Sequence, residues 1–211
     1  MSLQDVRDRI ARACDSCGRD QATVTLVAVS KTVSVDEIQR VYDQGHRVFG
    51  ENRLQEALPK ITALPSDIEW HFVGRLQSNK AKAVAEAFAV IHTLENERQL
   101  AGIGKASRLI DGLIELNLGR EVQKGGNLPE SLDNTLNLVQ EYSNVRFRGL
   151  MTVGPLTPNP EGNRPLFRQL AELGRKVGAE WLSMGMSADI EAAIQEGSTH
   201  VRVGTAIFGE R

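Results

Sequence analysis

A lysine that follows an apolar run near the N-terminus could act as a nucleophile. Residues 25–29 favour a β-strand, and Ser30, Lys31 and Thr32 follow them directly. A continuous apolar run bounded by polar residues is typical of a strand buried on both faces of a parallel sheet. Lys31 is therefore predicted at the carboxyl end of such a strand, where α/β proteins bind ligands. Partial loss of hydration there would favour the neutral, nucleophilic amine. A lysine that merely extends into water is the alternative.

Two glycine-bearing turns near the C-terminus could hold an anion. Residues 182–189 predict a strand, a glycine turn and a helix start, with the Ser187 hydroxyl in the turn. Gly204 and Thr205 lie in a second turn of this kind. Free N–H groups at helix starts bind anions, and barrels commonly hold a phosphate after strands seven and eight. Two ordinary tight turns are the alternative.

Arg202 alternates with two valines on the last predicted strand. If the valines face the surrounding helices, Arg202 points inward, where an unpaired charge costs several kcal/mol. Its partner is either a carboxylate from another strand or a ligand's ring nitrogen or phosphate. A strand-end lysine, a phosphate cradle and an inward arginine together describe a pocket for pyridoxal 5'-phosphate. A cationic arginine at the pyridine nitrogen would keep that nitrogen unprotonated and weaken the ring as an electron sink.

Strands and helices that could position these residues alternate along the whole chain. Eight strands are predicted, at 25–29, 47–49, 69–73, 90–93, 113–118, 145–151, 181–183 and 200–203. Helices are predicted at 2–17, 35–42, 53–64 with an interruption near Pro59, from an Asn79 cap to Phe88, at 96–108, from Pro129, at 166–177 and at 189–196. Eight consecutive strand–helix units favour a (β/α)8 TIM-type barrel with an additional N-terminal helix. An open doubly wound sheet is the alternative, and no linker divides residues 1–211, so one domain is expected.

Composition excludes several classes of function. Charged residues make up 25% of the 211 residues and the net charge is −2, so no basic field indicates nucleic acid. No apolar run has the length of a membrane span and no signal peptide is evident, so a cytoplasmic protein is expected. Cys14 and Cys17 fall in the first predicted helix, which favours two ordinary thiols over a redox motif or half of a zinc site.

Few groups at the strand ends suit metal binding or hydrolysis. The carboxylates there are Glu51, Glu95 and Asp189, and paired carboxylates for hydrolysis are poorly supported. No His/Cys cluster indicates a metal site, because the histidines lie on four separate units, at positions 46, 71, 92 and 200.

Several long motifs resemble the pyridoxal phosphate homeostasis proteins, the YggS/PROSC family, which look like the alanine racemase barrel domain standing alone. They are VAVSKT at 27–32, FGEN at 49–52, WHFVGRLQSNK at 70–80, RGLM at 148–151, LSMGMSAD at 182–189 and VRVGTAIFG at 201–209. The resemblance implies a fold-type III cofactor site. It implies Lys31 as the Schiff-base lysine, Arg202 at the pyridine nitrogen, and Ser187, Gly204 and Thr205 on the phosphate. Asn52 is similar to the pocket asparagine of the family, and Arg75 stands where many members carry His or Pro.

Two functions from different classes are compatible with this resemblance. One is a carrier or buffer of pyridoxal 5'-phosphate in vitamin B6 homeostasis, without turnover, that acts as a monomer and supplies apo-enzymes. The other is a fold-type III enzyme such as an amino-acid racemase, which needs a base on each face of the α-carbon. Lys31 supplies one base, and Tyr42 and Tyr142 are expected on outer helices. The chain ends after its eighth strand, which implies that the second racemase domain is absent, so we expect the carrier.

Two further readings stay open. A Schiff-base aldolase would also use a barrel lysine, although Arg202 and the two turns have no evident role in it. Lys80 and Lys124 lie in predicted loops near the pocket. Either could receive the cofactor aldehyde during transfer, or be a solvated surface lysine.

Overall fold

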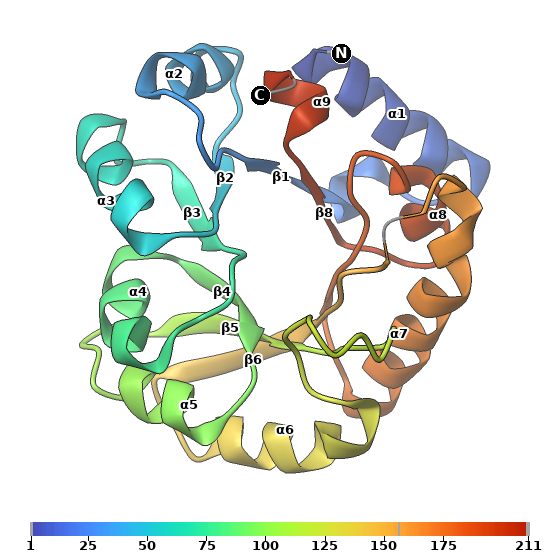
Figure 1. Cartoon of the computed structure of the whole chain (residues 1–211). Coiled ribbons are helices and arrows are strands. Elements are labelled where there is room, and N and C mark those ends of the chain that lie inside the picture. The colour runs from blue at the N-terminus through green and yellow to red at the C-terminus, as the bar shows by residue number, and fades with distance from the viewer. Residues whose placement is uncertain (1, 156, 210–211) are drawn as a thin grey trace.

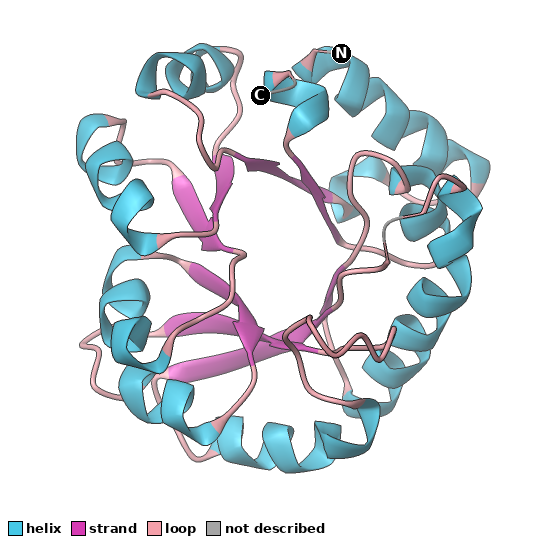
Figure 2. Cartoon of the chain, in the orientation of Figure 1, coloured by secondary structure: helices cyan, strands magenta, loops and turns pink. Residues whose placement is uncertain are grey.

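The computed structural model describes residues 2–155 and 157–209 and contains a closed barrel of eight parallel strands. Figures 1 and 2 show the strands as an inner ring with the helices around it. The strands run in chain order, and β8 pairs with β1 to close the ring, with His200 opposite Thr25 and Val203 opposite Ala28. They are β1 Thr25–Val29, β2 Val48–Glu51, β3 Glu69–Phe72, β4 Val90–Leu94, β5 Ile110–Glu115, β6 Val145–Met151, β7 Trp181–Ser183 and β8 His200–Val203. The predicted barrel is confirmed, and the open sheet is excluded.

The outer layer consists of α-helices that alternate with the strands, and short 3-10 turns lie in some of the connections between strand and helix. The helices are α1 Leu3–Ser16, α2 Val35–Asp43, α3 Leu54–Ala63, α4 Ala81–Ala87, α5 Glu97–Ile103, α6 Leu132–Gln140, α7 Arg164–Val177, α8 Ile190–Gln195 and α9 Thr205–Phe208. The 3-10 turns are Gln21–Thr23, Ser78–Lys80, Pro129–Ser131 and Pro160–Asn163. Among the described helices, none is long and apolar enough to cross a membrane.

Four local predictions about these elements are wrong. The interruption predicted near Pro59 does not occur, because α3 continues from Leu54 to Ala63 with Pro59 inside it. Asn79 does not cap a helix, because it lies inside the turn Ser78–Lys80 and α4 begins after it without a side-chain cap. The helix predicted over 96–108 ends at Ile103, where Gly104 lies so close to the ring of Tyr142 that a Cβ would be 2.7 Å from it. The strand predicted over 113–118 forms at 110–115, and residues 116–118 continue into the loop at the barrel mouth.

The additional N-terminal helix α1 packs against α8 in the last part of the barrel. The side chains of α1 that face the barrel are buried, and Cys14 is one of them, whereas Cys17 follows the helix and is exposed. Arg9 of α1 forms an ion pair with Glu191 of α8 at 2.7 Å. The same guanidinium donates a hydrogen bond to the carbonyl oxygen of Ser187 at 2.9 Å. Packing and an ion pair therefore join the predicted extra helix to the turn before α8.

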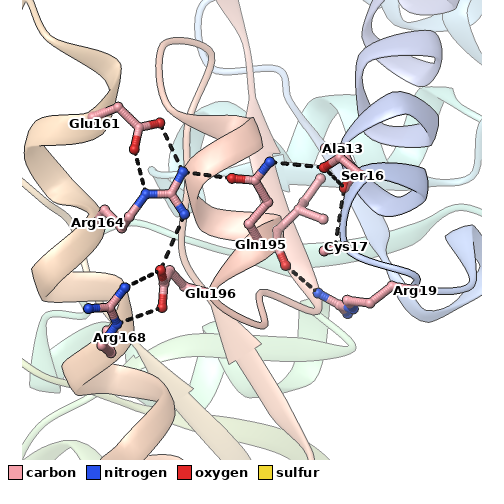
Figure 3. A network of polar contacts seen from close by, with 10 residues as sticks. Ala13, Ser16, Cys17, Arg19, Glu161, Arg164, Arg168, Gln195 and Glu196 are labelled. Carbon is pink, nitrogen blue, oxygen red and sulfur yellow. Dashed lines mark hydrogen bonds and ion pairs between the residues drawn. The ribbon is translucent and has the colours of Figure 1, made fainter.

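A polar network holds α8 between α7 and α1, as Figure 3 shows. Arg164 of α7 donates to Glu196 at 3.2 Å and to the amide oxygen of Gln195 at 2.6 Å. On the other side, Gln195 donates to the Ser16 hydroxyl at 2.9 Å, and Arg19 donates to the Ile194 carbonyl at 2.7 Å. Helix α8 has only six residues, so these contacts, rather than its own helix propensity, fix its position.

Below the turn that carries Lys31, a buried ion pair supports the ends of β1 and β2. The Lys60 ammonium of α3 donates to Glu51 Oε1 at 2.7 Å and to the Ser30 carbonyl at 2.8 Å. The Ser30 hydroxyl donates to the same carboxylate oxygen at 2.7 Å. Glu51 is fully buried and Lys60 is 8% exposed. Loss of one member would leave the other as an unpaired buried charge.

We predict that Lys60→Met lowers the free energy of unfolding by about 3–5 kcal/mol, because the Glu51 carboxylate then stays buried without a cation. Chemical denaturation measures the change. Lys82→Met, on an exposed face of α4, serves as the control and should change stability by less than about 0.5 kcal/mol. Equal effects of the two substitutions would show that the buried pair contributes nothing.

Candidate cofactor site

A cavity of about 510 Å³ lies at the carboxyl ends of the strands. It is lined by Val29, Lys31, Asn52, Val73, Gly74, Val153, Met186, Ser187, Ala188, Arg202, Gly204 and Thr205. All six residues that the sequence singles out, Lys31, Asn52, Ser187, Arg202, Gly204 and Thr205, are among them. The closed barrel therefore brings residues from the ends of β1, β2, β7 and β8 to a single cavity, although residues 31 and 202 lie far apart in the sequence.

Lys31 is held in a tight turn between two buried residues. Ser30 is fully buried, and its N–H donates to the Gly50 carbonyl at 2.8 Å. Val33 is 4% exposed, and its N–H donates to the Ser30 carbonyl at 3.0 Å, which closes the turn. Thr32 has a φ of 61°, in the left-handed region that β-branched residues avoid. Such strain concentrates at functional sites, and here it presents the exposed Lys31 at the cavity.

Arg202 points into the barrel, as the alternation of the last strand predicts, and is 6% exposed. Its guanidinium donates to the Ser183 hydroxyl at 2.5 Å and to the Thr152 carbonyl at 2.9 Å. Burial lowers the pKa of Arg202 to about 10, and the nearby carboxylates Glu115 and Asp189 oppose that change. The group stays cationic at neutral pH. Its hydrogen-bond partners among the described residues are neutral oxygens, so its charge is available to a ligand in the cavity.

The turn between β7 and α8 is braced from inside by Asp189. This carboxylate is 4% exposed and accepts from the Met186 N–H at 2.7 Å and from Asn163 at 2.8 Å. Asp189 is one of the carboxylates that the sequence predicts at the strand ends, and in the structure it supports this turn. From outside, Arg9 donates to the Ser187 carbonyl at 2.9 Å, and Ser187 is one of the residues that line the cavity.

Close backbone approach explains two glycines of the wall. A Cβ on Gly204 would lie 3.1 Å from the Val29 carbonyl oxygen, and one on Gly74 would lie 2.1 Å from the carbonyl oxygen of Asn52. A side chain at either position would push neighbouring strand ends apart. Asn52 Oδ1 is buried and has no hydrogen-bond partner among the described residues. An unpartnered acceptor in the wall is consistent with a ligand that donates to it.

Three basic residues named in the sequence prediction do not line this cavity, and their surroundings differ. Arg75 and Lys80 line a second cavity of about 390 Å³, which shares Asn52 with the first. Lys124 donates to the Gly154 carbonyl at 3.0 Å and pairs with Glu121 at 2.5 Å. Lys124 is thus held against the loop after β6, whereas Lys80 borders open space.

A pair of carboxyl groups near the pocket is missing from the sequence prediction. Burial raises the pKa of Glu115, at the end of β5, to about 7, and the neighbouring carboxyl of Glu95 adds to the effect. Glu115 is the last residue of β5, Glu95 directly follows β4, and Gly125 packs against both. Glu115 is absent from the sequence prediction because the strand is predicted at 113–118, which places residue 115 inside the strand and not at its end.

The histidines also require a correction. They lie on separate units, as the sequence indicates, yet three of them meet inside the barrel. The rings of His71 and His92 are 5.0 Å apart, and that of His200 is 6.0 Å from each. Burial lowers the pKa of His92 well below its ordinary value. In the part of the chain that the structure describes, no group of three His, Cys, Asp or Glu side chains could hold a metal ion.

Comparison with known proteins identifies a family. The model of the alanine racemase N-terminal domain family matches residues 1–211. A pyridoxal phosphate homeostasis protein of Aquifex aeolicus is 44% identical, with 99% of this chain and 96% of that protein covered. A protein of the same name from Escherichia coli is 40% identical, with 100% of this chain and 95% of that protein covered.

Solved structures agree with this comparison. PipY of Synechococcus elongatus with pyridoxal phosphate bound has a TM-score of 0.80 at 33% identity, covering 95% of this chain and all of that one. A crystal structure of an unknown protein from Bifidobacterium adolescentis has a TM-score of 0.89 at 32% identity, covering 97% and 92% of the two chains. Alanine racemase of E. faecalis has a TM-score of 0.70 at 15% identity, with 59% of its chain covered, which is a likeness of fold.

The raised pKa of Glu115 predicts a pH dependence of stability. Because this pKa is about 7 in the folded chain and ordinarily 4.5, the folded state binds the extra proton between these values. The free energy of unfolding due to this group therefore falls as the pH rises from about 4.5 to about 7 and is constant above that. Denaturation at about pH 5 and about pH 8 should show a smaller loss for Glu115→Gln than for the wild type. The exposed Glu97→Gln is the control and should keep the wild-type loss; an identical loss in Glu115→Gln would contradict the assignment.

Proposed function

The chain belongs to the alanine racemase N-terminal domain family and to the pyridoxal phosphate homeostasis proteins within it, and from this premise we propose that it binds pyridoxal 5'-phosphate through Lys31 as a reversible carrier or buffer of the cofactor. PipY, a relative with 33% identity, has been solved with pyridoxal phosphate bound. The observation that carries the proposal is the convergence of an amine, a buried guanidinium and two glycine turns on one cavity.

The residues of this cavity suit the cofactor's three functional parts. Lys31 offers a primary amine to the aldehyde, and Arg202 offers a charged donor to the ring nitrogen. Ser187, Gly204 and Thr205 line the cavity at the turns before α8 and α9, where backbone N–H groups would hold the phosphate. Asn52, whose Oδ1 has no partner among the described residues, would receive a donor from the cofactor. A volume of about 510 Å³ is within the range of small-ligand pockets.

The chemistry that the cofactor supplies is condensation of its aldehyde with an amine, which forms a Schiff base, releases water and is reversed by water. Lys31 lies in an exposed turn, so water and competing amines reach it. Arg202 carries its own proton and donates hydrogen bonds, which keeps a facing ring nitrogen unprotonated. Both features favour reversible storage over electron withdrawal from a substrate.

Racemisation would need a second base, and the cavity wall offers little to serve as one. Among the described lining residues, Lys31 and Arg202 alone titrate, and Arg202 is cationic. The tyrosines lie elsewhere: the Tyr42 hydroxyl donates to Asp67 at 2.7 Å, and the Tyr142 ring packs beside Gly104. Racemisation is therefore the less favoured function. As a carrier the chain would act as a monomer and pass the cofactor to apo-enzymes, with Lys80 better placed than Lys124 to take part.

We predict that the protein mixed with pyridoxal phosphate develops the visible absorption of a lysine-bound cofactor, and that Lys31→Ala abolishes it, because the amine is removed. The control, Lys82→Ala, removes an exposed lysine of α4 and should leave the absorption intact. Borohydride reduction followed by peptide mass mapping should locate the adduct on Lys31. An unchanged spectrum in Lys31→Ala, or an adduct only on another lysine, would remove the central claim.

A second prediction separates the carrier from the racemase. Incubation of the loaded protein with alanine in deuterated water should give no Lys31-dependent exchange of the α-hydrogen, because Arg202 would keep the pyridine nitrogen unprotonated and so weaken the ring as an electron sink. Nuclear magnetic resonance of the amino acid measures the exchange. Incorporation of deuterium that disappears in Lys31→Ala would replace the carrier with an enzyme.

A further inference from the structure

Inside the barrel, a continuous chain of hydrogen bonds connects the cavity with the opposite end of the barrel. Arg202 donates to the Ser183 hydroxyl at 2.5 Å, and this hydroxyl is 2.8 Å from His92 Nδ1. His92 Nε2 is 2.9 Å from His71 Nδ1, and His71 Nε2 is 2.8 Å from Glu69 Oε1. The chain crosses from β8 through β7 and β4 to β3.

The two ends of this chain have opposite character. Arg202 is only a donor. Glu69 is an acceptor when ionised, and its hydrogen bond from His71 holds its pKa below the ordinary value. It is the first residue of β3, so it lies at the amino end of the barrel, where half of its side chain is exposed. Arg202 lies on the cavity wall at the other end.

These ends fix the direction of every hydrogen between them. The Glu69 carboxylate can only accept, so His71 carries a hydrogen on Nε2, and with one hydrogen on each ring it accepts at Nδ1. His92 then donates from Nε2 and accepts at Nδ1. The Ser183 hydroxyl is left to donate to His92 while it accepts from Arg202. With one hydrogen on each ring, all donors thus point from Arg202 towards Glu69, and both imidazoles are Nε2–H tautomers.

Burial makes this order energetically important. His71, His92 and Ser183 are all fully buried, so water does not substitute for a broken link. A buried donor or acceptor without a partner costs about 1–3 kcal/mol, which favours the one arrangement that satisfies each atom. The burial that lowers the pKa of His92 also keeps that ring neutral, in agreement with this arrangement.

We propose that this row of hydrogen-bonded residues positions the Arg202 guanidinium on the cavity wall. The positioning residues are Ser183, His92, His71 and Glu69, and by orienting Arg202 they set how tightly the protein holds its cofactor. The link to the cofactor rests on the proposed function. None of the three residues His71, His92 and Glu69 lines the cavity, so their effect on the cofactor passes through Ser183 and Arg202. A role in packing alone would require neither a fixed tautomer nor a response at a distance.

The test starts with the cofactor-free protein. Nitrogen-15 spectra of its imidazoles should show His71 and His92 both protonated at Nε2 and bare at Nδ1. Glu69→Gln replaces the acceptor-only group by an amide that also donates, so both rings should then populate both tautomers. The control is Glu180→Gln, which removes another exposed carboxylate beside the amino end of β7 that pairs with Arg148 at 2.8 Å and lies outside the chain.

The second measurement is the dissociation constant of pyridoxal phosphate. We expect an increase of about threefold in Glu69→Gln and about tenfold in Ser183→Ala, which removes the acceptor of Arg202 directly, with no change in Glu180→Gln. His92 protonated at Nδ1 in the wild type, or unchanged affinity in Glu69→Gln, would overturn the proposal. If the wild type bound no cofactor, the proposed function and the effect of these residues on cofactor binding would both be overturned. The tautomers of His71 and His92 would still test the hydrogen-bond chain by themselves.

Discussion

The burial of one guanidinium sets the conditions for the rest of the site. Arg202 is 6% exposed inside a closed barrel, and in the described part of the chain its hydrogen bonds go to a hydroxyl and a carbonyl. Loss of hydration costs a cation several kcal/mol, and two neutral acceptors compensate only part of this. The barrel interior contains a row of hydrogen-bonded polar side chains, which leads from Ser183 through two imidazoles to Glu69. A ligand acceptor in the cavity would supply further compensation, which links the stability of the interior to occupancy of the site.

The walls of the cavity are held by interactions that lie outside it. The buried Lys60–Glu51 pair ties the end of β1 to that of β2 and supports the turn that presents Lys31. After β7, Asp189 braces the turn with Ser187 from inside, and α1 holds it from outside through Arg9. Since α8 is short, its position depends on partners in α7 and α1. The N-terminal helix is thus part of the support of the site, although it contributes no residue to the cavity.

The same geometry limits the chemistry. A single lysine amine suffices for reversible binding of an aldehyde, and its exposed turn gives water access. Racemisation of an amino acid requires a strong electron sink and a base on each face of the α-carbon. Arg202 opposes the first requirement. The second is not met by the titratable groups in the described cavity wall, and Glu115, whose pKa is raised to about 7, borders a neighbouring cavity instead. Storage and release of the cofactor need neither feature.

The sequence by itself determined the barrel, the inward direction of Arg202 and six residues of the cavity wall. The barrel follows from strand–helix alternation, and the direction of Arg202 follows from the valines beside it. Ser187, Gly204 and Thr205 follow from glycine turns after two strands, whereas Asn52 rests on the family resemblance. Local patterns failed where helix and strand ends depend on neighbours, as at Gly104, beside the ring of Tyr142. Only the tertiary structure decided that His71 meets His92, that Glu95 approaches Glu115 and that Lys60 reaches Glu51. The physical reason is that the closure of the barrel and the stagger of its strands determine which side chains lie at the same height along the barrel axis. Burial then strengthens the interactions between those side chains.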